Sequence, residues 1–199
     1  MKQKNYSSHL ITFIHRADME PRNSLSFSWM SGSLHRIIGL GFGSGLSPIA
    51  PGTAGTLLGW VLFSIGYAAL PNAVLAIAIT LGSIYGLWVC GRCSKDLHRP
   101  DDGAIVWDEI IAFWIVLIFI MPTNIGIQAL AFALFRFFDA IKPGPIGMID
   151  RHFKSIDDDH NSSSILQILW RGFGIMVDDL AAAFFTLLII ALIQRLIPL

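Results

Sequence analysis

Two pairs of adjacent carboxylates border otherwise apolar segments of this sequence, Asp108-Glu109 and Asp178-Asp179. Mg²⁺ in proteins is typically held by one or two carboxylates together with water and substrate phosphate oxygens. Because adjacent residues on a helix point about 100° apart, the two members of each pair can contact different partners. We therefore predict that these four acids, with Asp96 as a fifth candidate, bind Mg²⁺. We also expect Asp108, Glu109 and Asp178 to act in catalysis.

A second group of charged residues has a regular spacing. Arg136, Asp139 and Lys142 are three residues apart, and Pro143 follows them. Residues spaced in this way share one face of a helix, and a proline ends a helix. A cation, an anion and a cation in a row suit a phosphate bound beside a metal ion. Arg136 and Lys142 are therefore candidates for substrate binding and Asp139 for catalysis, whereas an ion pair within the helix is the alternative interpretation.

Residues 39–56 contain six glycines, two prolines, four hydroxyl side chains and no charge. This segment is too interrupted to be a spanning helix, and we expect it to be non-helical. Glycines allow the backbone to approach an anion closely, and successive N–H groups can bind phosphate. The segment therefore offers Gly43, Ser44, Gly45 and Thr53 as substrate-binding candidates. Close packing of helices through small residues is the alternative explanation.

The elements that carry these residues are those of an integral membrane protein. Of the 199 residues, 54% are hydrophobic and 14% are charged, and the mean hydropathy is +0.62. About 25% charged residues is usual for a soluble domain, so the chain has too few charges for a water-facing surface. The 14 basic residues balance the 14 acidic ones, which excludes a basic nucleic-acid binder. The composition carries no information about the oligomeric state.

The apolar stretches predict an all-α, polytopic helical bundle with about five transmembrane helices, preceded by the glycine-rich segment. A helix needs about 20 mostly apolar residues to cross the hydrocarbon core of a bilayer. Turns at Pro71-Asn72 and at 122–124 separate neighbouring stretches into helical hairpins. The expected spans are 53–70, 73–91, 104–121, 125–141 and 175–197.

The basic residues predict the orientation of these helices. All of them except Arg195 lie before the first span, between the second and third, or at or after the end of the fourth. The positive-inside rule then places the N-terminus and all acidic residues on the cytoplasmic side. Residues 1–33 are polar and are expected to form a cytoplasmic tail without fixed structure, and residues 34–199 the membrane-embedded domain. A small membrane transporter or structural subunit with an interfacial acidic cluster is the alternative function.

The two cysteines favour no chemistry of their own. Cys90 and Cys93 form a single C-x-x-C pair without the second pair that a zinc site needs. Cys93 and Arg99 have the C-x₅-R spacing of cysteine phosphatases, but the residues between them include no glycine and place Asp96 where phosphate would bind. We expect both cysteines to be dispensable.

Four stretches of the chain, in this order, resemble the phosphatidylglycerophosphatase A family of bacterial inner-membrane lipid phosphatases. The resemblance covers roughly residues 37–197 and implies an Mg²⁺-dependent enzyme that converts phosphatidylglycerophosphate to phosphatidylglycerol at the cytoplasmic face of the inner membrane. It also implies that Arg151, in the third stretch, contacts substrate. The matching stretches are GFGSGLSPIAPGTAGTL (41–57), KDLHRPDDGAIVWDE (95–109), FRFFDAIKPGPIGMIDR (135–151) and GIMVDD (174–179).

Overall fold

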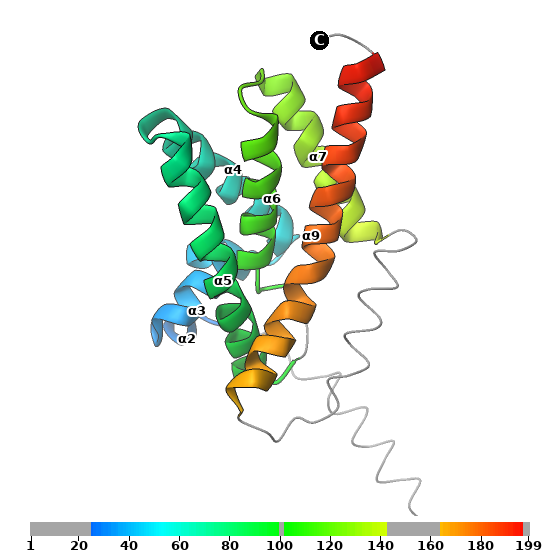
Figure 1. Ribbon diagram of the computed structural model, residues 1–199. Coiled ribbons are helices and arrows are strands. Elements are labelled where there is room, and N and C mark those ends of the chain that lie inside the picture. The colour runs from blue at the N-terminus through cyan, green and yellow to red at the C-terminus, as the bar shows by residue number, and fades with distance from the viewer. Residues whose placement is uncertain (1–24, 100–101, 143–163, 197–199) are drawn as a thin grey trace, which may run out of the picture.

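The structure, a computed structural model, describes residues 25–99, 102–142 and 164–196, and these residues form helices and no β-strand (Figure 1). The all-α prediction is therefore confirmed. The helices in chain order are α2 (Phe27–Ser31), α3 (Leu34–Gly39), the 3₁₀ helix η2 (Gly41–Leu46), α4 (Pro51–Ala69), α5 (Asn72–Leu97), α6 (Trp107–Ile120), α7 (Ile125–Ile141) and α9 (Ile165–Leu196).

Five of these helices, α4 to α7 and α9, correspond to the five expected spans, but two of them are longer than the apolar stretches. α5 continues to Leu97, and α9 begins at Ile165 instead of residue 175. Hydropathy marks only the apolar part of a helix, whereas the backbone hydrogen bonds continue into polar turns. As a consequence, Asp178 and Asp179 lie in the middle of α9 and not at its start.

Helix α6 lies at the centre of the bundle and contacts α4, α5, α7 and α9 (Figure 1). Its residues Ile110 to Phe113, together with Val116 and Leu117, are completely buried. Two tryptophan side chains of α6 reach its neighbours, since Trp114 donates a hydrogen bond to the Gly59 carbonyl of α4 and Trp107 one to the Gly82 carbonyl of α5. The start of α6, where Asp108 and Glu109 lie, is thereby held in place from two sides.

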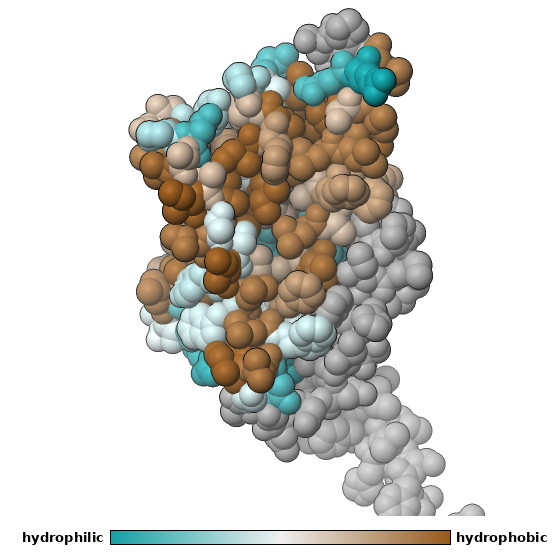
Figure 2. All heavy atoms as spheres, in the orientation of Figure 1, coloured by the Kyte–Doolittle hydropathy of each residue, from teal (hydrophilic) through white to brown (hydrophobic). Residues whose placement is uncertain are grey.

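Among the described residues, three helices, α4, α5 and α9, are long and apolar enough to cross a membrane. α6 has 14 residues and α7 has 17, which is less than the about 20 that a perpendicular crossing requires. Figure 2 shows a broad hydrophobic band across the molecule, with hydrophilic residues along its upper edge. Exposed apolar side chains on the outer sides of the long helices include Leu57, Val61, Ile65, Ile77, Leu81, Ile84, Phe184 and Leu188.

Glycines allow the closest helix contacts. A Cβ atom on Gly91 of α5 would lie 1.9 Å from the Ile168 carbonyl oxygen, and one on Gly172 of α9 would lie 1.8 Å from the Leu87 carbonyl oxygen. At such distances only a hydrogen fits, so these two glycines set the separation of α5 and α9 where they cross. On α4, a Cβ atom on Gly55 would lie 2.6 Å from Val106 Cβ, and one on Gly59 would lie 3.3 Å from Ile110 Cα.

The N-terminal helix α3 packs against α5, and α2 packs against α3 and η2. α2 lies within the segment predicted to be an unstructured tail, yet its Met30 is buried and belongs to the same hydrophobic cluster as Leu40, Cys90 and Cys93. The difference arises because a five-residue helix gives too short a hydrophobic pattern to be recognised in sequence.

Candidate active site

The candidate site lies where four helices meet: the start of α4, the start of α6, the end of α7 and the middle of α9. In Figure 1 the last three of these regions lie at a similar level of the bundle. α4 begins with Pro51 at its first position, which suits a helix start because proline lacks an N–H. α7 ends at Ile141, and the next residue, Lys142, caps it with a left-handed backbone conformation. Each helix therefore begins or ends next to the charged residues, except α9, which passes through the site.

Arg136 connects three of these side chains. Its Nη1 atom lies 2.9 Å from Glu109 Oε1, 2.7 Å from Asp139 Oδ2 and 3.3 Å from Thr56 Oγ1. The Thr56 hydroxyl in turn donates to the Gly52 carbonyl at 2.9 Å. Arg136 therefore forms the ion pair within α7, with Asp139. It also connects α7 to α6 through Glu109 and to α4 through Thr56.

Two polar atoms of this network have no hydrogen-bond partner among the described residues. They are Glu109 Oε2, an acceptor, and Arg136 Nε, a donor, and both are buried. A buried polar group without a partner costs about 1–3 kcal/mol. The site therefore presents an unused acceptor and an unused donor on two side chains that are already paired with each other.

Lys142 forms a third ion pair of the site. Its ammonium group contacts Asp178 Oδ2 on α9, so the end of α7 is joined to α9. The Asp179 backbone N–H donates to Asp178 Oδ1 at 3.1 Å. Asp178 and Asp179 are both buried, with 6% and 3% of their surfaces exposed.

The structure brings together five of the predicted acidic side chains. Asp179 interacts electrostatically with Asp108, Glu109, Asp139 and Asp178. Two cations of the described chain, Arg136 and Lys142, pair with members of this group. Five carboxylates against these two cations leave a formal charge of −3, a surplus that a divalent cation would reduce to −1.

No group of three or more His, Cys, Asp or Glu side chains in the described parts of the chain is already arranged around a common point as a metal site. Glu109 and Asp178 are turned toward Arg136 and Lys142 instead. Metal binding through these acids therefore stays a prediction.

The glycine-rich segment packs more than was expected from its sequence. Residues 41–46 form η2, a short 3₁₀ helix with positive φ angles at Gly41, Phe42 and Gly43, and are not part of a spanning helix. The expectation that the whole segment is non-helical is wrong for residues 51–56, which form the first turns of α4 because Pro51 suits the first position of a helix. A Cβ atom on Gly45 would lie 2.0 Å from the Ala104 carbonyl oxygen, so this glycine is needed for contact with the segment before α6. Ser44 Oγ donates to the Gly41 carbonyl within the same turn.

Gly52 has the closest contact with the acidic cluster. A Cβ atom there would lie 2.0 Å from Glu109 Oε1, so only glycine allows the carboxylate to rest against the start of α4. Thr53 follows Gly52 in the first turn of α4 and is half-buried. Gly52 and Thr56 were not among the predicted site residues, although both belong to the same PGTAGT sequence as Thr53.

Asp96 lies in a different cluster. Its carboxylate is 2.9 Å from His35 Nε2, 2.9 Å from Arg36 Nη2 and 3.2 Å from Arg92 Nε. These contacts join α3 to the end of α5. The structure therefore does not bring Asp96 together with the other predicted metal ligands. Arg151, a predicted substrate contact, lies outside the described residues.

Comparison with known proteins gives a family match over most of the chain. The family model "Phosphatidylglycerophosphatase A" matches residues 37–194. The chain is 36% identical to "Phosphatidylglycerophosphatase A" of Haemophilus influenzae, over 79% of this chain and 87% of the relative. It is also 36% identical to the protein of that name from Escherichia coli, over 77% of this chain and 78% of the relative.

A third relative bears another name. "Putative phosphatidylinositol-3-phosphatase" of Bacteroides thetaiotaomicron is 33% identical, over 81% of this chain and 94% of the relative. No solved structure matches the chain. The family match spans α3 to α9 and so includes every described residue of the acidic cluster. The chain belongs to the phosphatidylglycerophosphatase A family.

Proposed function

We propose that this protein hydrolyses the terminal phosphate monoester of phosphatidylglycerophosphate and releases phosphatidylglycerol and inorganic phosphate, with Mg²⁺ as cofactor. The family membership and the names of two relatives support the substrate. The grouping of acids and cations at one meeting point of four helices supports the reaction type, because phosphate hydrolysis depends on positioning and on charge neutralisation.

The observation that carries the proposal is the pair of unused buried atoms, Arg136 Nε and Glu109 Oε2. A phosphate oxygen would accept a hydrogen bond from Arg136 Nε, and a cation would satisfy Glu109 Oε2. Because the two residues are joined by an ion pair of 2.9 Å, an anion and a cation bound to them would be neighbours. A phosphate monoester accompanied by a divalent cation has this arrangement of charges.

The residues of the cluster fit Mg²⁺ by the chemistry of their donors. Asp108, Glu109, Asp178 and Asp179 are oxygen ligands, and soft ligands are not needed for this ion. The −3 surplus of the cluster would otherwise repel a phosphate dianion. When bound, Mg²⁺ would neutralise phosphate oxygens and lower the pKa of a coordinated water.

The protein's own groups would perform the remaining tasks. Arg136 and Lys142 would bind and orient the phosphate oxygens, for which an Arg–phosphate pair is well suited. In the hydrolysis a water oxygen forms the new bond to phosphorus, and the bond to the headgroup oxygen breaks. A cluster carboxylate would take the proton from water and return it to the departing headgroup oxygen.

We also propose that the site faces the cytoplasm in the bacterial inner membrane. Thirteen of the fourteen basic residues lie before α4, in α5 or the segment after it, or between the end of α7 and the first part of α9, on the same side as the acidic cluster in the predicted topology. The positive-inside rule assigns that side to the cytoplasm.

The function can be tested with purified protein and phosphatidylglycerophosphate in mixed micelles. We expect phosphate release that EDTA abolishes and added Mg²⁺ restores. Asp108→Asn and Asp178→Asn should each lower the rate on the order of 10²-fold or more and raise the Mg²⁺ concentration for half-maximal rate. Asp157→Asn, in the segment outside the described residues, serves as the control and should leave the rate and the Mg²⁺ requirement nearly unchanged. Activity that survives both chelation and the two substitutions would contradict a metal-dependent reaction in this cluster.

A further inference from the structure

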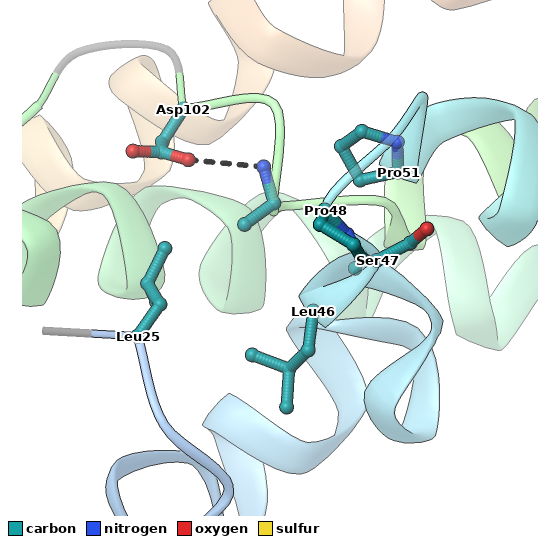
Figure 3. A pocket seen from close by; sticks show the side chains of 8 residues that line it. Leu25, Leu46, Ser47, Pro48, Pro51 and Asp102 are labelled. Carbon is teal, nitrogen blue, oxygen red and sulfur yellow. Dashed lines mark hydrogen bonds between the residues drawn. The ribbon is translucent and has the colours of Figure 1, made fainter. Parts of the chain in front are cut away.

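A cavity of about 200 Å³ lies at the start of α4 and has no role in the function proposed above (Figure 3). Its wall comes from η2 and the residues after it, from the start of α4, from the segment before α6 and from Leu25. The lining residues are Leu25, Gly45, Leu46, Ser47, Pro48, Pro51, Asp102 and Ala104.

The cavity and the acidic cluster share the start of α4. Pro51 lines the cavity, and the next residue, Gly52, touches the Glu109 carboxylate. Consecutive Cα atoms are about 3.8 Å apart, so the first turn of α4 borders both the cavity and the cluster. The cavity is also small compared with pockets for drug-sized ligands, which measure about 300–1,000 Å³. This size suits a short headgroup and not an acyl chain.

The polar side chains of the wall are hydrogen-bond acceptors. Asp102 is buried, and one of its oxygens accepts from the Ala104 N–H at 3.0 Å (Figure 3). Its other oxygen accepts from Arg99 Nη1 at 2.9 Å. Ser47 Oγ donates its proton to the Ile49 carbonyl at 2.8 Å. A carboxylate oxygen can accept more than one hydrogen bond, and the Ser47 oxygen keeps its lone pairs. The wall therefore suits a ligand that donates through hydroxyl groups.

A phosphate group does not match this wall. The eight lining residues include one carboxylate and no Lys or Arg. Apart from Asp102 and Ser47, the wall consists of Leu, Pro, Ala and Gly residues, which pack well against C–H groups. Hydroxyl donors on a short carbon chain have both properties.

We propose that this cavity binds the polyol part of the lipid headgroup, with Asp102 and Ser47 accepting hydrogen bonds from its hydroxyl, while the terminal phosphate lies in the acidic cluster. This inference rests on the proposed function, because it places the glycerol of phosphatidylglycerophosphate between the two phosphates. It makes the cavity the part of the molecule that selects the headgroup.

The test compares phosphatidylglycerophosphate with an analogue whose headgroup glycerol is replaced by 1,3-propanediol, so that only the free hydroxyl is missing. For the unmodified protein we expect kcat/KM to be at least about tenfold lower for the analogue, because a site built to bind a hydroxyl rejects a ligand without it. In Ser47→Ala and in Asp102→Asn this difference should shrink to about threefold or less.

Ser64→Ala is the matched control, since Ser64 Oγ also donates to a backbone carbonyl but lies on the exposed side of α4. It should keep the full difference between the two lipids. Equal kcat/KM for both lipids in the unmodified protein would overturn the inference and leave the phosphatase function intact. A Ser47→Ala variant that keeps the tenfold difference would overturn the role of Ser47. Absence of activity toward both lipids would instead reject the proposed function.

Discussion

At the scale of single residues, the site contains side chains that form ion pairs and still have hydrogen-bonding atoms without a partner among the described residues. Arg136 is in contact with Glu109, Asp139 and Thr56 through one nitrogen, Nη1, while its Nε is unused by any described residue. The contact set holds the guanidinium in one orientation before substrate arrives. Such preorganisation lowers the cost of binding an anion, because little side-chain entropy remains to be lost.

Replacing Arg136 by lysine tests this orientation. Lysine keeps the positive charge, but its three N–H donors share a single nitrogen and lack the planar fork of arginine. It therefore cannot contact Glu109 and also place a donor where Arg136 Nε lies. We expect Arg136→Lys to lower kcat/KM by about tenfold or more while expression stays normal. Phosphate release measured over a range of lipid concentrations gives this ratio. Full activity in Arg136→Lys would mean that charge alone is required at this position.

Gly52 allows a second residue-scale prediction. Gly52→Ala places a methyl group 2.0 Å from the position of Glu109 Oε1, so the carboxylate must move away from α4. We expect at least a tenfold loss of kcat/KM. The control is Gly66→Ala in the same helix, where the new methyl group meets only the end of the Leu75 side chain at 3.1 Å. If both variants were equally active, the position of Glu109 against α4 would be unimportant for turnover.

At the scale of elements, α3 is held against α5 by the Asp96 cluster and against α6 by the backbone. The Val106 N–H donates to the Gly39 carbonyl at 2.9 Å, directly before the start of α6. Asp96 pairs with His35 and Arg36, which lie on the same short helix as Gly39. Through these contacts Asp96 supports the segment that leads to Asp108 and Glu109, and we propose that it positions this segment instead of binding a metal ion.

The variant Asp96→Asn distinguishes a positioning role of Asp96 from metal binding. Removing the charge weakens three contacts with basic side chains, and we expect a loss of stability of about 1–3 kcal/mol. The Mg²⁺ concentration for half-maximal rate should stay unchanged. Thermal unfolding in detergent and Mg²⁺ titration of the rate measure the two effects. A raised Mg²⁺ requirement, equal to that of Asp108→Asn, would restore Asp96 as a metal ligand.

At the scale of the whole molecule, the helices place charged and apolar surfaces in separate regions. Exposed apolar side chains lie along α4, α5 and α9, and Figure 2 shows a broad hydrophobic band on the face that it draws. The turns after α4 and α6 carry no Lys or Arg. α6 and α7 are shorter, but most of the α6 side chains are buried against other helices. A short helix in the centre of a bundle is therefore compatible with membrane insertion.

The predicted topology can be checked with reporter fusions. Fusions at Asn72 and at Asn124, in the turns before α5 and α7, should report the periplasm, and a fusion at His98 should report the cytoplasm. The expectation follows from the positions of the basic residues. A cytoplasmic signal at Asn124 would contradict five crossings and would place the end of α7 on the opposite side from the start of α6.

The sequence by itself determined the helical class, the membrane character and the order of the helices. Long apolar stretches without charge have one stable form in lipid, since a helix satisfies its backbone hydrogen bonds within itself. Local chemistry also identified Asp108, Glu109, Arg136, Lys142 and the Asp178-Asp179 pair, because charged residues are rare beside such stretches and stand out.

Only the tertiary structure decided which of these residues meet. Asp96 and Asp108 both follow the second apolar stretch in sequence, but the packing of α3 against α5 gives Asp96 basic partners of its own. Gly52 and Gly45 differ in the same way: one touches a carboxylate and the other a backbone carbonyl. Contacts between residues far apart in the chain depend on how helices cross, and no local pattern of residue types contains that information.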